Sequence, residues 1–209
     1  MTAMFDLSGK TAIVTGANTG IGQGIALALA EAGANIAAVG RSPATETVEK
    51  ARALGRQAEI ISADLSTIEP VDRIIDETKE KLGSVDILVN NAGIIRRNDA
   101  VDFTEEDWDA VMDTNLKSMF FLCQAAGREM IAAYEADGRI GKIINIASML
   151  TFQGGIRVPS YTASKSGVGG VTKLLANEWA SKGVCVNAIA PGYIATNNTA
   201  ALQSDENRN

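Results

Sequence analysis

Apolar residues occur along this chain in short blocks rather than singly. Six blocks are apolar almost throughout and contain many β-branched residues. Such blocks are typical of strands that are covered by helices on both faces of a parallel sheet. The predicted strands lie at residues 10–15, 35–39, 57–63, 85–89, 142–147 and 184–190.

The longer segments between these blocks have helical spacing. In one of them the apolar residues recur at Val168, Val171 and Leu175, which predicts one apolar helix face. Thr104, three residues before Asp107, is typical of a helix N-terminus. The predicted helices span residues 20–32, 43–54, 68–82, 104–136 and 160–182. This alternation predicts an α/β fold, a Rossmann-like doubly wound parallel sheet in three α/β/α layers.

Composition fits one soluble domain. The chain has 209 residues, of which 46% are hydrophobic, and it contains no repeat or low-complexity linker. Its net charge of −6, with no long basic run, argues against nucleic acid or an anionic membrane as partner. No signal peptide or membrane-spanning run is present in the sequence. We therefore expect a cytoplasmic protein with a small-molecule partner.

The chain contains no histidine, and this restricts its chemistry. Its two cysteines, Cys123 and Cys185, lie among apolar residues and are read as small buried side chains in a reducing compartment. We therefore expect no metal site. Histidine is the usual proton carrier near neutral pH, so a reaction here would need another side chain.

A tyrosine beside a cation can serve as that proton carrier. Lys165 follows Tyr161 by four residues, so the two side chains share one face of the predicted helix, and the ammonium could lower the pKa of the phenol. Ser148, thirteen residues before Tyr161, ends a predicted strand and could point into the same cleft. Taken alone, such a Tyr–Lys pair is more often simply two neighbours on a solvated helix face.

A glycine-rich turn follows the first predicted strand. In doubly wound sheets, ligands bind beyond the carboxyl ends of the strands. The glycine spacing G-x-x-x-G-x-G, between a strand and a helix, predicts a pyrophosphate site of a dinucleotide, although a glycine-rich turn by itself is more often only a turn. The residues concerned are Gly16, Asn18, Thr19, Gly20, Ile21 and Gly22.

The next strand ends predict which dinucleotide binds. No carboxylate follows the second strand, and Arg41 could hold a 2′-phosphate there, which favours NADP(H). An arginine that stacks on adenine or stays solvated fits almost as well. Asp64, followed by Leu65, could accept a hydrogen bond from the adenine amino group. The segment 90–93 (NNAG) could lie beneath the adenosine ribose, and a plain turn is the competing interpretation.

Together these motifs resemble the short-chain dehydrogenase/reductase family over essentially the whole chain. They are TGANTGIG, Asp64, NNAG, Asn115, Ser148, YTASK at 161–165 and PGYIAT at 191–196, in family order. The resemblance implies that Ser148 binds the substrate oxygen, that Tyr161 is the general acid or base, and that Asn115 anchors a relay water. It also implies that Lys165 lowers the pKa of Tyr161 and binds the nicotinamide ribose. The further cofactor contacts it implies are Asn91, Ala92, Gly93, Pro191, Gly192, Ile194 and Thr196.

The runs 144–167 and 187–199 more closely resemble the sugar-acid dehydrogenases of that family. This implies hydride transfer between NAD(P) and a secondary alcohol or ketone of a sugar acid. The usual cofactor of these enzymes is NAD(H), whereas Arg41 favours NADP(H). A carboxylate substrate needs a local cation, for which Arg96, Arg97 and Arg157 are candidates, and we single out Arg157, with Gln153 as a hydroxyl partner. A solvated loop arginine is the better interpretation of any single one.

The resemblance also implies a homotetramer built on the helices at 104–136 and 160–182. Family members continue past Asn209 through a lid, a last helix and a last strand. The sequence is therefore either incomplete or that of a fragment with impaired activity, and we expect that it is incomplete. Gluconate 5-dehydrogenase and 3-oxoacyl-carrier-protein reductase are alternative activities. A dinucleotide-binding regulator without catalysis is an alternative of another class.

Overall fold

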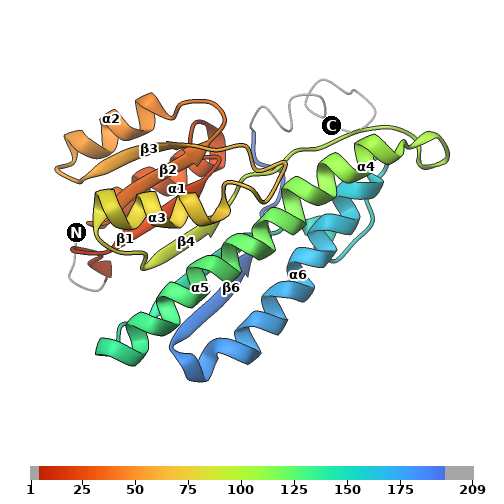
Figure 1. Cartoon of the computed structure of the whole chain (residues 1–209). Helices are drawn as coiled ribbons and strands as arrows, with labels where there is room; N and C mark the ends of the chain where they lie inside the picture. Colours follow the sequence, from red (N-terminus) through yellow and green to blue (C-terminus); the bar gives the residue numbers. More distant parts are fainter. Residues whose placement is uncertain (1–4, 196–209) are drawn as a thin grey trace.

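The computed structural model describes residues 5–195, and its centre is one parallel sheet (Figure 1). The strand order is β3-β2-β1-β4-β5-β6. All six predicted strands are confirmed, with bounds that differ from the predicted ones by at most two residues. The strands are β1 Thr11–Thr15, β2 Asn35–Gly40, β3 Ala58–Ser62, β4 Ile87–Asn90, β5 Gly141–Ile146 and β6 Val184–Ile189.

Helices cover the sheet on both faces, which confirms the predicted α/β/α layers. One apolar core joins the sheet to α3, α5 and α6, and a second joins its other face to α1 and α2 (Figure 1). The helices are α1 Gly20–Glu31, α2 Thr45–Ala53, α3 Val71–Leu82, α4 Glu105–Met112, α5 Ser118–Asp137 and α6 Pro159–Trp179. No helix in residues 5–195 has both the length and the apolarity that a membrane span needs.

The prediction of one continuous helix over residues 104–136 was wrong. A π-helical turn, η3 (Asp113–Lys117), separates α4 from α5. Asn115 lies in this turn with 2% of its surface exposed, and its side-chain amide bonds the backbone of Ile94 beyond β4. This inward contact accounts for the local departure from α-helical geometry. Such π turns within helices are frequent at functional sites.

The order of the strands places a ligand site at one edge of the sheet. The chain runs from β1 outward to β2 and β3 and then crosses back, so that β4 pairs with β1 on its other side. Strand order therefore reverses between β1 and β4. In doubly wound sheets the crevice outside the carboxyl ends of such strands is where ligands bind.

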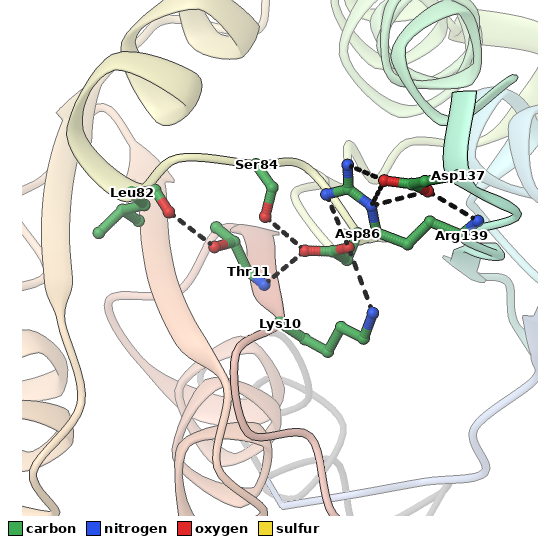
Figure 2. Close-up of polar contacts among 7 residues, drawn as sticks. All are labelled: Lys10, Thr11, Leu82, Ser84, Asp86, Asp137 and Arg139. Atoms are coloured by element: carbon green, nitrogen blue, oxygen red, sulfur yellow. Dashed lines mark hydrogen bonds and ion pairs between the residues drawn. The ribbon is translucent and has the colours of Figure 1, made fainter. Parts of the chain in front are cut away.

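The opposite, amino edge of the sheet is tied together by a buried carboxylate (Figure 2). Asp86, 4% exposed, accepts hydrogen bonds from the Thr11 backbone N–H at 2.9 Å and from the Ser84 hydroxyl. Lys10 Nζ and Arg139 Nη1 lie 3.7 and 3.8 Å from its Oδ1. Asp86 thus joins the segments that lead into β1, β4 and β5.

Candidate active site

The glycine-rich turn after β1 has the shape of a phosphate cradle. A Cβ at Gly22 would overlap the Gly16 carbonyl and the Asn91 side chain, so only glycine lets α1 approach this closely. Gly16 itself has a left-handed backbone, with φ of 65°. Thr19, the N-cap of α1, makes no side-chain capping bond, and the first turn holds no acidic residue. The free N–H groups of that turn therefore suit an anion, and the cradle fits a dinucleotide pyrophosphate.

Thr15 joins this turn to the segment after β4. Its Oγ1 accepts hydrogen bonds from the backbone N–H groups of Asn91 and Ala92, both at 2.9 Å. In return, Asn91 Nδ2 donates to the carbonyls of Thr15 at 2.9 Å and of Gly16 at 3.3 Å. The two predicted cofactor segments therefore form one unit at the point where the strand order reverses.

Arg41 and Asp64 come together at the ends of β2 and β3. The pKa of Asp64 is lowered, mainly by the Ser66 backbone N–H that bonds its Oδ1 at 3.0 Å, and in part by the charge of Arg41. Leu65 is buried, and its carbonyl accepts a 2.7 Å hydrogen bond from Ser118 Oγ. Two residues predicted for the adenosine end of a dinucleotide thus lie within electrostatic reach of each other.

Ser148 and Tyr161 also come together, although they belong to different elements. Ser148 ends the β5 segment and caps the 3-10 turn η4 (Met149–Thr151), where its Oγ accepts from Leu150 N at 3.2 Å. The Ser148 hydroxyl also lies close enough to the Tyr161 phenol, near the start of α6, to act to lower its pKa. Ser148 Oγ accepts from the Leu150 N–H, and its own proton remains available to donate.

Lys165 lies one helical turn after Tyr161 and is 5% exposed. Its Nζ is 5.6 Å from the centre of the Tyr161 ring and donates a hydrogen bond to the Ile146 carbonyl. Burial disfavours the ammonium and lowers the pKa of Lys165 to about 8. This lysine can therefore change its protonation state near neutral pH.

In this structure the pKa of Tyr161 shifts in the direction opposite to the expected one. Burial raises it, and this outweighs the lowering by the Ser148 hydrogen bond and by the charge of Arg97. The Nζ of Lys165 lies 5.6 Å from the ring centre and bonds the Ile146 carbonyl. The charge of Arg97, which follows the NNAG segment, acts to lower the pKa of the phenol.

Asn115 connects the π turn to the catalytic helix. Its Oδ1 accepts from Ile94 N at 2.8 Å, and its Nδ2 donates to Ile94 O at 2.9 Å and to Ser164 Oγ at 3.3 Å. Ser164 Oγ in turn donates to the Tyr161 carbonyl at 2.8 Å. Asn115 thus holds the segment after β4 against the start of α6, and its role in binding a relay water stays a prediction.

The three candidate arginines have different surroundings. Arg96 Nε pairs with Asp107 at 3.1 Å, and Arg157 Nε pairs with Asp99 at 3.1 Å. Both pairs are largely exposed. Arg97 is the one whose charge reaches the Tyr161 phenol. The structure therefore brings Arg97, more than the other two, to the candidate catalytic residues.

The other predicted residues belong to the segments that follow η4 and β6. Gln153 is exposed in the loop between η4 and α6. Pro191, Gly192 and Ile194 follow β6, and Thr196 lies outside the described residues. Thr151, which the motifs did not single out, bonds the backbone of both Ser148 and Lys165. The spacing Ser148-x-x-Thr151 at a strand end resembles a helix-capping pattern and is the signal that could have identified it.

The family model for short chain dehydrogenases matches residues 10–207. Among curated proteins, the 2-dehydro-3-deoxy-D-gluconate 5-dehydrogenase of Escherichia coli (strain K12) is 58% identical over 204 residues, covering 98% of this chain and 79% of that protein. A 3-oxoacyl-[acyl-carrier-protein] reductase of Staphylococcus epidermidis is 42% identical over 199 residues, 94% of this chain and 80% of the relative.

Solved structures of similar sequence have the same fold and are described as related dehydrogenases. A structure from Agrobacterium tumefaciens, described as a 2-deoxy-D-gluconate 3-dehydrogenase with bound NADP, is 54% identical with a TM-score of 0.89, covering 99% of this chain and 80% of its own. Another from Beutenbergia cavernae, described as an NAD(P)-dependent gluconate 5-dehydrogenase with NADP at low occupancy, is 44% identical with a TM-score of 0.90, covering 98% and 80%.

Proposed function

This chain belongs to the short-chain dehydrogenase family, and we propose that it is an NAD(P)-dependent oxidoreductase of sugar acids. The reaction is hydride transfer between nicotinamide and a secondary alcohol or ketone of a substrate like 2-dehydro-3-deoxy-D-gluconate. The observation that carries this proposal is the meeting of Ser148, Tyr161 and Lys165 at the sheet edge that also holds the glycine cradle. The substrate class rests on the names of the relatives that cover nearly the whole chain.

The dinucleotide, when bound, supplies the hydride acceptor or donor. In alcohol oxidation the substrate carbon loses a hydride and its hydroxyl loses a proton, which Tyr161 Oη accepts. Ser148 donates a hydrogen bond to the substrate oxygen and orients it toward Tyr161. In the reverse direction Tyr161 returns the proton to the oxygen as the carbonyl carbon is reduced. Lys165 keeps a positive charge beside the tyrosine below pH 8, where its pKa of about 8 leaves it protonated.

Residues of the first three strand ends would hold the dinucleotide. The cradle of Gly16 and Gly22 takes the pyrophosphate, and Asp64 takes the adenine. Arg41, at the end of β2, would pair with a 2′-phosphate, so we infer that NADP(H) is the preferred cofactor, and NADP in two of the similar structures supports this. Arg41→Ala is expected to lower kcat/KM with NADP about tenfold while the value with NAD changes little. An unchanged ratio between the two cofactors would contradict the preference.

Arg97 is the leading residue for the substrate carboxylate. Of the three candidates, it is the one whose charge acts on the pKa of Tyr161. Arg97→Gln is expected to raise KM for a sugar acid by about tenfold or more, since hydrogen bonds to charged groups contribute about 1.5–3 kcal/mol. Arg96→Gln, one residue away, is the matched control and should change KM little.

A homotetramer and a cytoplasmic location belong to the same proposal. Leu174 on α6 and Trp108 on α4 are 53% and 40% exposed, as apolar side chains at a subunit contact would be in the isolated chain. Light scattering coupled to size-exclusion chromatography of the purified protein measures the assembly directly. A monomer at micromolar concentration would contradict the tetramer.

The activity is tested by following reduced nicotinamide with a panel of substrates and both cofactors. The panel contains 2-dehydro-3-deoxy-D-gluconate, 2-deoxy-D-gluconate, gluconate and a 3-oxoacyl thioester. We expect the highest kcat/KM with one of the two deoxy sugar acids. Preference for the thioester would replace the substrate class, and cofactor binding without turnover on any substrate would favour a regulator.

A further inference from the structure

The side chain of Thr151 joins the turn that follows Ser148 to α6, where Ser166 Oγ also donates to the Leu150 carbonyl at 3.4 Å. The Ser148 backbone N–H donates to Thr151 Oγ1 at 3.3 Å, and Thr151 Oγ1 donates to the Lys165 carbonyl at 2.9 Å. The Thr151 N–H donates to the Ser148 carbonyl at 2.9 Å and closes the turn. One hydroxyl therefore joins the backbone of Ser148 to the backbone of Lys165.

The methyl group of Thr151 fixes the same contact from the side. It packs against Gly169, where an added Cβ would come within 2.6 Å of Thr151 Cγ2. Gly169 follows Lys165 by one helical turn, so the hydroxyl and the methyl of Thr151 contact neighbouring turns of α6. The β-branched side chain has few accessible rotamers, and both contacts hold it in one of them.

This link matters because Ser148 and Tyr161 reach the site from separate elements. Ser148 ends β5, Tyr161 and Lys165 belong to α6, and their relative position depends on how η4 docks on the helix. Leu150, inside η4, also bonds Ser148 Oγ through its backbone N–H. A small shift of η4 would therefore move the Ser148 hydroxyl away from the Tyr161 phenol.

We propose that Thr151 is a positioning residue that sets the Ser148 hydroxyl against Tyr161 by joining η4 to α6. This inference rests on the proposed oxidoreductase function. Thr151 touches neither Tyr161 nor a reacting atom, and it acts through Ser148 and Lys165. Its loss should therefore lower turnover more than it lowers cofactor affinity.

The first test compares three variants by steady-state kinetics and cofactor titration. Thr151→Val keeps the shape and removes the hydroxyl, and we expect kcat to fall by about 10- to 100-fold with an unchanged cofactor Kd. Thr151→Ser restores the hydroxyl and should keep kcat within about threefold of the wild type. Should Thr151→Val accumulate unfolded, Thr151→Ala removes the same hydroxyl with less bulk.

Thr78→Val is the matched control for a buried threonine. Thr78 is fully buried in α3, and its hydroxyl bonds the Ile74 carbonyl at 2.7 Å, far along the chain from the site. It should lose stability while keeping the kcat of the wild type. Equal kcat values for Thr151→Val and Thr78→Val would overturn the proposal.

A second test reads the Ser148–Tyr161 contact without turnover. With Tyr134 and Tyr193 replaced by Phe, Tyr161 is the last tyrosine, and its phenolate absorbance can be titrated. The charged groups around it, Arg97 and Lys165, stay the same in every variant. Thr151→Val should raise the pKa of Tyr161, as should Ser148→Ala, because the Ser148 side chain acts to lower it.

The two tests separate the inference from the function it rests on. If no sugar acid is turned over by the wild type, the proposed function fails and the tyrosine titration still decides the role of Thr151. A titration curve for Thr151→Val that matches the wild type would overturn the positioning role, whatever the substrate is.

Discussion

Lys165 and Asp86 are buried to nearly the same degree, 5% and 4% exposed, at opposite edges of one sheet. At the amino edge, Asp86 receives two hydrogen bonds and lies beside two cations, Lys10 and Arg139 (Figure 2). At the carboxyl edge, Lys165 bonds a carbonyl, and within residues 5–195 no carboxylate forms an ion pair with it. One buried charge is compensated by opposite charges, and the other is not.

The difference separates a structural charge from a chemical one. A buried charge with matched partners ties segments together and stays ionised. A buried amine without a counter-charge loses stability as an ammonium, and its pKa falls toward the working pH. Such perturbed groups are typical of active sites. Burial alone does not distinguish Lys165 from Asp86. The charges that surround each of them do.

The strongest test acts on the carboxyl edge alone. Tyr161→Phe removes the proton carrier and nothing that supports the sheet, so kcat should fall on the order of 10³-fold, with the cofactor Kd and Tm close to the wild type. Stopped-flow or long-time nicotinamide absorbance measures the residual rate. Wild-type turnover in this variant would remove Tyr161 from the chemistry.

Lys165→Met should move activity and stability in opposite directions. Loss of the cation beside Tyr161 is expected to lower kcat on the order of 10²-fold. The free energy of unfolding at pH 7 should rise by about 2 kcal/mol, because about 3 kcal/mol of ammonium burial disappears and one hydrogen bond is lost. Urea unfolding measures the second effect. A large loss of stability would show that Lys165, like Asp86, is a charge that stabilises the fold.

That gain in stability should depend on pH in a defined window. The pKa of Lys165 is about 8 in the folded chain, against 10.5 for an ordinary lysine. Between these values the unfolded state binds more protons than the folded one, so wild-type stability rises with pH there, by about 3 kcal/mol in total. Below pH 8 the penalty is fully present. Urea unfolding of wild type and Lys165→Met from pH 7 to pH 10 should show the gap closing, and a constant gap would contradict the lowered pKa.

The sequence predicted the strands and the local motifs of the site, but not the partners of the buried charges. Apolar blocks located all six strands because each is a short, mostly apolar run, and β1, β2 and β4 are buried on both faces. The glycine spacing and the Tyr–Lys step pointed to the carboxyl edge because these motifs are local in the chain. The partners of Lys165 were not predictable in this way. Its carbonyl acceptor, Ile146, and the hydroxyl that holds its backbone, Thr151, come from β5 and η4.

Long-range polar contacts were the common reason for the errors. The π turn at Asn115 depends on the Ile94 backbone, 21 residues away. The effect of Arg97 on Tyr161 depends on how the segment after β4 faces α6. Asp86 reads in sequence as one polar residue at a strand start, and its bond to Thr11 spans 75 residues. Periodicity carries no information about such pairs.

The smallest effect is expected at the amino edge. Asp86→Asn keeps the shape and one acceptor oxygen but removes the charge, so its bonds with the Thr11 N–H and Ser84 become weaker. Lys10 and Arg139 are each more than a third exposed and stay solvated when Asp86 is neutral, which limits the cost to about 2 kcal/mol of unfolding free energy. Per folded molecule, kcat and KM should equal the wild-type values, because no contact of Asp86 reaches the carboxyl edge. Urea unfolding with turnover normalised to folded protein measures both, and a fall in normalised kcat would show that the two edges are coupled through β1 and β4.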